Sequence, residues 1–498
     1  MFRYRLTAFA VGAAIMMAEM AAARAIAPHF GASIIVWTNV IGIVMLALAL
    51  GYWAGGRIAA AHPHVRVLGG IIIGAGILLL VPAFATRAIA GSLVLDALSF
   101  SGGFTALALG SFLSVTLLFA VPIALLGTVA PFLIQLAASG QDAVGRVAGS
   151  LYALSTVGSL VGTFLPALVL LPTIGTRRTI IVASVVLILV GAMLLPHARR
   201  GTSVAVLLAA ALLGVPDAPL PWFFGGEVIA ATESRYQYLR IVDRPSPREA
   251  GTRERMLIFN EGFGVQSIAV EEGSIPRGYF TALAAMPSLF SDGRALRVLI
   301  LGNAGGTIGH LLELSFPDRE IAITGVEIDP AVTTLTRAHF PPPPVAYPVV
   351  HADSRVFLQT TDAQYDIIVG DAYTDQLTIP AHLVSEEFFA LVARHLAEDG
   401  IAAFNINAPR DDSRLLASLT QTIRSAFPHV MIGSTPRSWN RIVLASNRVI
   451  DARASDALAS GIHFAVVERD PFRRPFTDDW APIELATDIE VLGAMLRP

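Results

Sequence analysis

Seven long apolar runs occupy the first 216 residues and limit what this chain can fold into. Most are close to the roughly 20 residues that an α-helix needs to cross a bilayer, and the last is short. With 54% hydrophobic residues and a mean hydropathy of +0.63, the chain is too apolar for one soluble protein of 498 residues. We therefore expect a polytopic transmembrane domain of about seven helices over residues 1–222. The runs lie near 6–26, 35–55, 67–86, 108–137, 147–172, 179–197 and 202–216.

Two features inside these runs predict how the helices pack. Gly158 and Gly162 form a GxxxG pattern, which favours the close approach of a second helix. Glu19 and Arg24 are ionisable residues inside an apolar run, where such residues are costly and often functional. Because they are five residues apart, they do not share one face of a helix. We expect each to pair with another helix or to reach the membrane interface, with a substrate path as the alternative.

The composition changes after residues 216–226, where charges become frequent and apolar runs shorten to strand length. Residues 223–290 predict a small antiparallel β unit and a lead-in helix. From 291 to 498, strands and helices alternate, as in a parallel sheet with helices on both faces. Strands are expected at 296–302, 321–327, 347–350, 365–370 and 400–406. Helices are expected at 305–315, 330–338, 384–397 and 411–425.

Charge and residue usage exclude several classes of function. A net charge of −3 argues against nucleic-acid binding as the main task. The chain has no cysteine, which excludes disulfides, thiolate chemistry and cysteine-based metal sites. Histidines are scattered without HxxxH or HExxH spacing, so we predict no metal site.

The sequence VLILGNAGGTIGHLLEL (298–314) predicts a buried strand, a glycine-rich turn and the start of a helix. Gly302, Gly305 and Gly306 would let the main chain pass close to a ligand at the carboxyl end of the strand. Such a turn usually holds a nucleotide or nucleoside, although many tight turns need glycine for steric reasons alone.

Acidic residues follow three further strands at the same predicted edge of the sheet. Glu327 stands where a carboxylate can accept both ribose hydroxyls, and a helix N-cap by Asp329 is an alternative that can hold together with it. Asp353 is equally suited to accept from an adenine amino group or to cap the following helix. Asp371 ends an apolar strand at the crevice where such sheets bind ligands, and Asp375 follows on the loop. With the glycine turn, these residues describe an adenosine site in an α/β class I methyltransferase-like (Rossmann-like) domain over residues 291–498.

The motifs of the second half resemble the spermidine synthase (polyamine aminopropyltransferase) family. The strand-four motif of that family is Y-D-V-I-[IL]-x-D, followed by a loop and E-x-F-[FY], and here it reads YDIIVGDAYTDQLTIPAHLVSEEFF. The glycine turn, VEIDPAV, and SRYQYLRIVD with Gln266 fall in the matching order. TDDWAPIE near the C-terminus is similar to a membrane-fused branch of the family. The first half resembles the same branch through AEMAAARAIAPHFGASIIVWTNVIG, ALGYWAGGRIAA and GRVAGSLYALSTVGSLVGTFLPALVLLPTIGTRRT.

The resemblance implies transfer of an aminopropyl group from decarboxylated S-adenosylmethionine to a polyamine or related amine, with Asp371 as catalytic base. A free alkylamine has a pKa near that of Lys, about 10.4, and must lose a proton before it attacks carbon beside a sulfonium. By the same resemblance, the donor nucleoside would bind to Gly302, Gly305, Gly306, Glu327, Asp353 and Gln266. The cationic acceptor would be held by Tyr236, Gln237, Asp375 and Tyr279.

Three departures from the soluble enzymes of this family concern the half of the site that holds the donor amine. Their glycine turn carries an Asp that helps to hold the aminopropyl ammonium, and here that place is Ala304. Their Tyr-His-Glu run becomes residues 279–281, Tyr-Phe-Thr, and the paired aspartates stand one residue further apart, at Asp371 and Asp375. Ordinary S-adenosylmethionine or a different acceptor therefore becomes an alternative.

Two rival functions follow from these departures and from the apolar half. One is an S-adenosylmethionine-dependent methyltransferase that acts on a membrane-borne acceptor, and the other is a polyamine transporter or sensor with a regulatory nucleoside-binding domain. S-adenosylmethionine-type donors are cytosolic, so we expect a multi-pass protein of the cell inner membrane with its catalytic domain on the cytoplasmic side. The expected partners are a small-molecule amine and the lipid bilayer, without nucleic acid. Soluble relatives form dimers or tetramers, which leaves a homo-oligomer open.

Overall fold

The computed structural model describes residues 1–498 apart from several segments. The chain divides into two compact units, Met1–Ala218 with Glu233–Gln237, and Pro219–Thr232 with Tyr238–Pro498. The segments left out are 32–33, 100–102, 139–140, 196–210, 216–224, 248–249, 261, 263, 271–277, 292, 341–345, 375–376, 437, 452–461 and 496–498.

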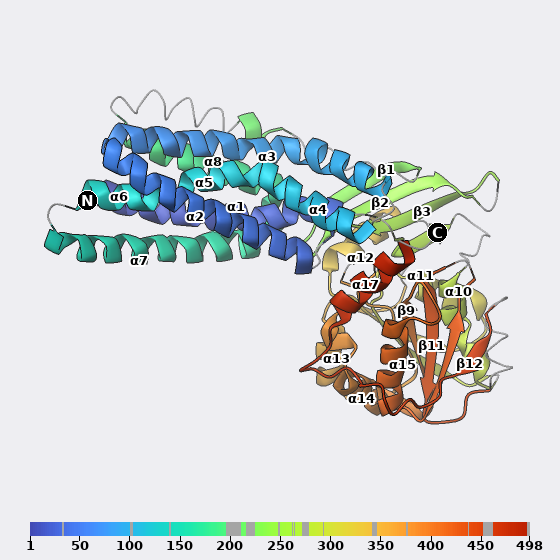
Figure 1. The fold of residues 1–498 in the computed structure, drawn as a ribbon. Helices are drawn as coiled ribbons and strands as arrows, with labels where there is room; N and C mark the ends of the chain where they lie inside the picture. The colour runs from blue at the N-terminus through green and yellow to red at the C-terminus, as the bar shows by residue number, and fades with distance from the viewer. Residues whose placement is uncertain are drawn as a thin grey trace. The chain divides into compact units, whose positions relative to one another are not determined.

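The first unit is a bundle of long apolar helices (Figure 1). Five stretches of the described chain are long and apolar enough to cross a membrane: Phe2–Phe30, Ile34–Ala61, Val65–Leu93, Ala108–Ala137 and Val144–Met193. The last stretch, Val144–Met193, contains two of the predicted runs. The helix is interrupted between them at Gly175, which has a φ of 77°. The predicted run 202–216 lies outside the described residues except for 211–215. The helices are α1 (Phe2–Phe30), α2 (Ile34–Ala61), α3 (Val65–Ser99), α4 (Gly103–Val115), η1 (Thr116–Ala120), α5 (Val121–Gly127), α6 (Val129–Ala137), α7 (Gln141–Leu165), η2 (Pro166–Leu170) and α8 (Leu171–Met193).

The GxxxG pattern of α7 packs against α1, as predicted from the sequence. A Cβ atom added to Gly158 would lie 2.0 Å from the carbonyl oxygen of Phe9, and one added to Gly162 would lie 2.1 Å from that of Ala13. Both distances are far shorter than a van der Waals contact. Only glycine at these two positions therefore allows the two helices to approach so closely.

Two charged side chains place the loop at residues 233–237 in the first unit. Arg24 of α1 donates hydrogen bonds to the carbonyl oxygens of residues 234–236, at 2.8 Å for the last of them. Glu233 accepts from the main-chain N–H of Thr176 at 2.9 Å and from its hydroxyl, so it caps the helical segment that restarts after Gly175. The partner of Arg24 is thus a loop main chain, where the sequence predicted another helix or the interface.

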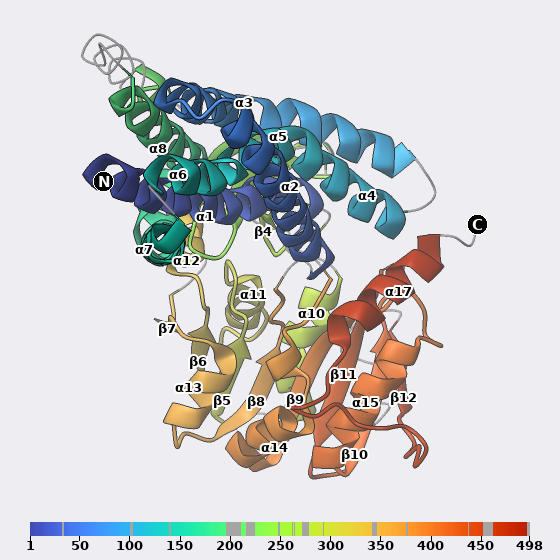
Figure 2. The ribbon, with the colours of Figure 1, turned by 60° about the vertical axis from the view of Figure 1, so that its left-hand side comes forward.

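The second unit contains a small antiparallel sheet and a large mixed sheet (Figures 1 and 2). The small sheet has the order β1-β2-β3-β4, with β1 (Glu227–Glu233), β2 (Tyr238–Pro245), β3 (Arg253–Phe259) and β4 (Ser267–Val270). The large sheet has the order β12-β10-β11-β9-β8-β5-β6-β7. Its strands are β5 (Leu296–Leu301), β6 (Ile321–Val326), β7 (Val349–Val350), β8 (Tyr365–Gly370), β9 (Leu396–Asn407), β10 (His429–Ser434), β11 (Asn440–Ser446) and β12 (Phe464–Val466).

Five strands of the large sheet, β7, β6, β5, β8 and β9, are parallel, and β11, β10 and β12 continue it in alternating directions. The strand order reverses at β5, which has β6 on one side and β8 on the other. This is the arrangement of a doubly wound, Rossmann-like methyltransferase fold, and it confirms the predicted fold class. The three strands beyond β9 were not predicted from the sequence.

Helices cover both faces of the large sheet (Figure 2). Along β5, Val298 and Ile300 pack with α10 and α11, whereas Leu299 and Leu301 pack with α14 and α15. All four side chains are at most 1% exposed, as expected of a parallel strand that is buried on both faces. The helices of this unit are α10 (Tyr279–Ala284), η3 (Met286–Leu289), α11 (Thr307–Ser315), α12 (Pro330–His339), α13 (Ser354–Thr360), η4 (Ala381–Leu383), α14 (Glu386–His395), α15 (Arg414–Ala426) and α17 (Ile483–Met495).

Candidate active site

The carboxyl ends of four neighbouring strands meet at one edge of the large sheet. The ladder continues into the turns that follow the strands, since the N–H of Asp371 donates to Leu301 at 2.8 Å and that of Glu327 donates to Val350 at 3.0 Å. The point where the strand order reverses, between β5 and its neighbours, is where doubly wound sheets bind their ligands. The predicted site residues that follow β5, β6 and β8 therefore begin at the expected edge.

The glycine turn after β5 brings two parts of the main chain into contact. Gly302 has a φ of 84°, and a Cβ atom there would lie 2.4 Å from the carbonyl oxygen of Asp371. Gly305 donates its N–H to the hydroxyl of Ser267 at 2.8 Å, and a Cβ atom would lie 2.8 Å from the Cβ of Ser267. The glycines thus hold the turn against β8 and the small sheet. Ala304 adopts a positive φ of 44°, which is uncommon for a residue with a Cβ atom.

Glu327 fastens this turn from β6. Its carboxylate accepts from the N–H of Ala304 at 2.9 Å and from the N–H of Asp329 at 3.0 Å. Burial raises the pKa of Glu327 to about 7, against the opposing effect of these hydrogen bonds. Asp329 in turn caps α12 by accepting from Ala331 at 3.0 Å, as the sequence allowed. The main-chain N–H of Ile328 also acts on the carboxylate of Glu327, and the role of Glu327 toward ribose stays a prediction.

Asp353 caps α13 and also binds a histidine. It accepts from the N–H groups of Arg355 at 2.9 Å and Val356 at 3.1 Å, and it lies 2.8 Å from Nε2 of His382. Burial alone would raise the pKa of this carboxyl, but the hydrogen bonds from His382 and from the helix N–H groups lower it below its usual value. The capping alternative is therefore present in the structure, and the role toward adenine stays a prediction.

Asp371, directly after β8, is held by two donors. Nδ2 of Asn405 donates to its Oδ1 at 2.8 Å, and the phenol of Tyr279 donates to its Oδ2 at 3.2 Å. Burial raises the pKa of Asp371 to about 7, and both hydrogen bonds act against that rise. Burial, the charge of Asp371 and the nearby Tyr373 raise the pKa of Tyr279 well above its usual value, so its phenol remains a donor. A carboxyl with a pKa near neutrality is suited to accept a proton during a reaction.

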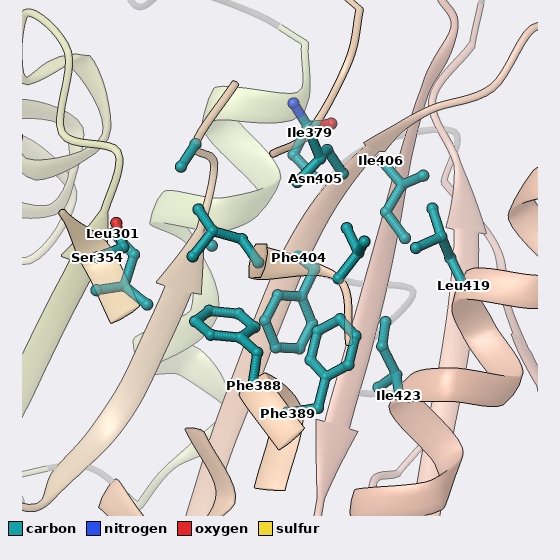
Figure 3. Close-up of a pocket in the computed structure, with 14 residues that line it drawn as sticks. Leu301, Ser354, Ile379, Phe388, Phe389, Phe404, Asn405, Ile406, Leu419 and Ile423 are labelled. Carbon is teal, nitrogen blue, oxygen red and sulfur yellow. The ribbon is translucent and has the colours of Figure 1, made fainter. Parts of the chain in front are cut away.

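A small apolar pocket lies in the second unit, with Asn405 and Phe404 of β9 among its lining residues (Figure 3). Gly370 and Ala372, the sequence neighbours of Asp371, line it together with Asn405 and Ser354. Most of the lining side chains belong to the buried core of the unit, so the pocket is a small gap in the core next to the site and leaves no room for a nucleoside or an amine. The remaining lining is apolar and consists of Leu301, Ile379, Leu383, Val384, Phe388, Phe389, Phe404, Ile406, Leu419 and Ile423.

The other predicted site residues fall in different places. Gln266 precedes β4, and its N–H donates to Leu257. Gln237 is buried and Tyr236 is half exposed, and both group with the first unit, so the site described here is built without them. Asp375 lies outside the described residues. Within the part of the chain that the structure describes, His, Asp and Glu side chains form no group of three that could hold a metal ion.

Sequence reasoning missed Asn405 and the residue behind it, Asn440. The only signal was the alternation of polar and apolar residues in FNIN (404–407), at the end of an otherwise buried strand. A polar residue at the carboxyl end of the strand next to β8 was the kind of residue to look for there.

The fold of the second unit is that of the class I methyltransferase type, and its candidate site lies at the edge where such sheets bind ligands. Residues 277–441 match the family described as the spermine/spermidine synthase domain. This part of the chain is therefore similar to the spermine/spermidine synthase domain, and the relatives of the chain include polyamine aminopropyltransferases.

Three relatives illustrate the extent of this homology. A probable polyamine aminopropyl transferase of Bifidobacterium longum is 32% identical over 43% of this chain and 46% of its own length, so the chain spans less than half of that relative. The polyamine aminopropyltransferase of Mycobacterium tuberculosis is 29% identical over 77% of both chains. Polyamine aminopropyltransferase 2 of Ralstonia nicotianae is 25% identical over 89% of this chain and 87% of its own. These last two matches reach into the apolar half.

Solved structures with similarity to this chain include two spermidine synthases. A probable spermidine synthase from Corynebacterium glutamicum covers 50% of this chain and all of its own, with a TM-score of 0.41 and 19% identity. Spermidine synthase from Thermotoga maritima covers 54% of this chain and 87% of its own, with a TM-score of 0.35 and 18% identity.

Proposed function

We propose that this protein is a membrane-integrated aminopropyltransferase that transfers an aminopropyl group from decarboxylated S-adenosylmethionine to a polyamine or related amine. The observation that carries the proposal is Asp371, which directly follows β8 at the edge where such sheets bind ligands and binds Tyr279 and Asn405. With a pKa of about 7, this carboxyl is partly ionised at neutral pH and fully ionised above it, and its ionised form can take a proton from an amine. The match to the spermine/spermidine synthase domain supports the donor class.

The reaction needs one proton acceptor and a bound sulfonium. The acceptor nitrogen forms a bond to the aminopropyl carbon, the bond from that carbon to sulfur breaks, and the electron pair returns to sulfur. Methylthioadenosine leaves without charge. The proton that the cationic amine loses before it attacks passes to Asp371, and the product nitrogen remains a secondary ammonium. The glycine turn with Glu327 and Asp353 binds the nucleoside in this proposal, and Tyr279 orients the base.

The role of Gln266, Tyr236, Gln237 and Asp375 in substrate binding remains part of the proposal. The donor question is tested with purified protein by calorimetry with decarboxylated and ordinary S-adenosylmethionine. Tighter binding of the decarboxylated donor is expected, and preference for the carboxylated one would overturn the aminopropyl reaction.

Ala304 favours a second candidate, a methyltransferase that uses ordinary S-adenosylmethionine on a membrane-borne acceptor. A methyl group at this turn position offers no counter-charge to an aminopropyl ammonium and no repulsion to a donor carboxylate. Asp at this position tolerates the positive φ, so Ala304→Asp is a usable probe. If the wild type discriminates weakly between the donors, the variant should prefer the decarboxylated donor by at least about tenfold more, as expected for one charge pair of roughly 1.4 kcal/mol.

The location in the cell is also proposed: a multi-pass protein of the inner membrane, with the catalytic domain on the cytoplasmic side, where sulfonium donors are made. Because the chain has no cysteine, one introduced cysteine reports on accessibility without background. Phe472 is 96% exposed, which makes Phe472→Cys a suitable site. A membrane-impermeant maleimide should label this variant only after the cells are opened, and labelling in intact cells would contradict the placement.

A further inference from the structure

A chain of side-chain amides ends on Asp371. Nδ2 of Asn405 donates to Oδ1 of Asp371 at 2.8 Å, and Oδ1 of Asn405 accepts from Nδ2 of Asn440 at 3.0 Å. The same Nδ2 of Asn440 also donates to Oδ1 of Asn407 at 3.1 Å, and the hydroxyl of Ser438 donates to Oδ1 of Asn440 at 2.5 Å. Each amide in this chain therefore uses its oxygen and its nitrogen on different partners.

The strand register places these amides together. In the antiparallel pair of β9 and β11, Asn440 lies opposite Asn407, and Asn405 precedes Asn407 by two residues on the same face. The phenol of Tyr373 donates to the carbonyl of Asn405 at 2.8 Å and accepts from the N–H of Asn407 at 3.1 Å. The end of β9 is therefore fixed from the loop that follows Asp371.

This arrangement determines which end of the Asn405 amide faces the carboxylate. If the amide were turned over, its oxygen would meet the oxygen of Asp371, and its NH2 group would meet the NH2 group of Asn440. Turning Asn440 as well would set its oxygen against the oxygen of Asn407. With Asp371 ionised and the Asn407 amide oriented as it is, only this orientation of Asn405 and Asn440 leaves their donors on acceptors, so Asn440 supports Asn405 as a donor to Asp371.

We propose that Asn405 and Asn440 form a positioning pair, and this inference rests on the proposed function. The pair fixes the Asp371 carboxylate and keeps it ionised for proton transfer. Asn405 immobilises Oδ1, and Oδ2 keeps a lone pair beyond the bond from Tyr279 for the acceptor amine. Hydrogen bonds to the charged form of a carboxyl favour that form.

In the described part of the chain, no cationic side chain binds Asp371 to keep its carboxylate ionised. The side chains that bind Asp371 there are Asn405 and Tyr279, and Tyr373 is a further titratable group beside Tyr279. A buried carboxylate without a cationic partner depends on neutral donors to remain charged. The hydrogen bond from Asn405 lowers the pKa of Asp371 against the effect of burial, which agrees with the geometry.

The test is the pH dependence of aminopropyl transfer by the purified full-length protein. Asn405→Leu removes the donor at similar volume, and the acid limb of kcat should move upward by about one pH unit, the order expected for a hydrogen bond to a charged group. At pH 9 the variant should recover to within a few-fold of the wild type. Asn405→Gln keeps a donor and should restore part of the shift.

Asn440→Asp tests the orientation argument. A carboxylate at this position only accepts, so Asn405 should turn its NH2 group toward it and present its oxygen to Asp371. The acid limb should then move at least as far as in Asn405→Leu. Ser446→Ala is the matched control, because it removes a buried hydrogen bond of the same strand, 2.7 Å to Gly400, without contact to Asp371. Its pH profile should be that of the wild type.

Two results would overturn the positioning role: an unchanged acid limb in both asparagine variants, or an equal loss of rate at every pH, which indicates a structural effect. A wild type that transfers no aminopropyl group refutes the proposed function instead. In that case the thermal unfolding of Asn405→Leu still tests the pair, because the fall of Tm with rising pH should continue to a higher pH than in the wild type. A Tm curve with the same pH dependence as the wild type would refute the pair independently of activity.

Discussion

Replacing Asp371 with Asn separates the chemistry of this residue from its packing. The carbonyl of the new side chain can accept from Asn405 where Oδ1 did, and its NH2 group can donate to the phenol oxygen of Tyr279, whose hydroxyl rotates. Both neighbours keep a hydrogen bond to residue 371, so we expect the fold to tolerate the change. Only the capacity to take a proton is lost.

The two effects of Asp371→Asn have opposite signs. Loss of a general base lowers kcat by roughly 10²–10⁴-fold, or about 2.7–5.4 kcal/mol of transition-state stabilisation. The pKa of this carboxyl rises from 3.8 to about 7 on folding, so its ionised form destabilises the native state by about 4 kcal/mol. Because the folded pKa is raised, this destabilisation is absent below pH 4, develops as the pH rises to 7 and is complete above it.

Asp371→Asn should therefore be far less active and yet more stable than the wild type at pH 8. Methylthioadenosine formation measures the first effect, and thermal unfolding in detergent at pH 5 and pH 8 measures the second. The gain in Tm should be present at pH 8 and small at pH 5. A variant that loses activity and stability together at pH 8 would refute the reasoning, because Asp371 would then be a structural residue.

Three further substitutions test the roles of Tyr279, Glu327 and Arg24. Tyr279→Phe removes a donor to the base, so the acid limb of kcat should move upward, and an unchanged pH profile would contradict the role of the phenol. Glu327→Gln leaves one acceptor oxygen where two main-chain N–H groups donate. One of these groups then lacks an acceptor, at a cost of about 1–3 kcal/mol, so the affinity for the sulfonium nucleoside, measured by calorimetry, should fall by roughly 5- to 100-fold. Arg24→Met removes the hydrogen bonds to residues 234–236, so limited proteolysis should cut this loop faster, and an unchanged rate would show that Arg24 does not hold it.

The sequence predicted the fold of the second unit well because its parallel strands are continuous apolar runs. The alternation from 296 to 426 carries a clear period, and each expected strand and helix is present with ends moved by a few residues. The antiparallel strands β10, β11 and β12 were missed for two reasons. β12 is only three residues long, and no glycine-rich turn precedes β10, which follows α15, or β11, which follows β10. In the first unit, the helix break at Gly175 lies between the runs 147–172 and 179–197, which the sequence had separated.

The candidate site was predictable where a residue follows a strand. Gly302, Glu327, Asp353 and Asp371 could be found because parallel strands bring their carboxyl ends to one edge. What these side chains bind could not be predicted, since Glu327 fastens the turn through main-chain N–H groups.

The role of Asn405 could not be predicted from the sequence, also for a physical reason. Its function depends on Asn440, which is 35 positions away and becomes its neighbour only through the antiparallel pairing of β9 and β11. Tyr236 and Gln237 show the converse, because their motif matched the family whereas the loop around them groups with the first unit.

The most direct test of the account is mass spectrometry of the products formed by the purified full-length protein from decarboxylated S-adenosylmethionine and a panel of polyamines. The account predicts methylthioadenosine and an amine heavier by one aminopropyl group in equal amounts, with both reduced at least about a hundredfold in Asp371→Asn. Absence of both products for every amine, or their formation at the wild-type rate in Asp371→Asn, would contradict it.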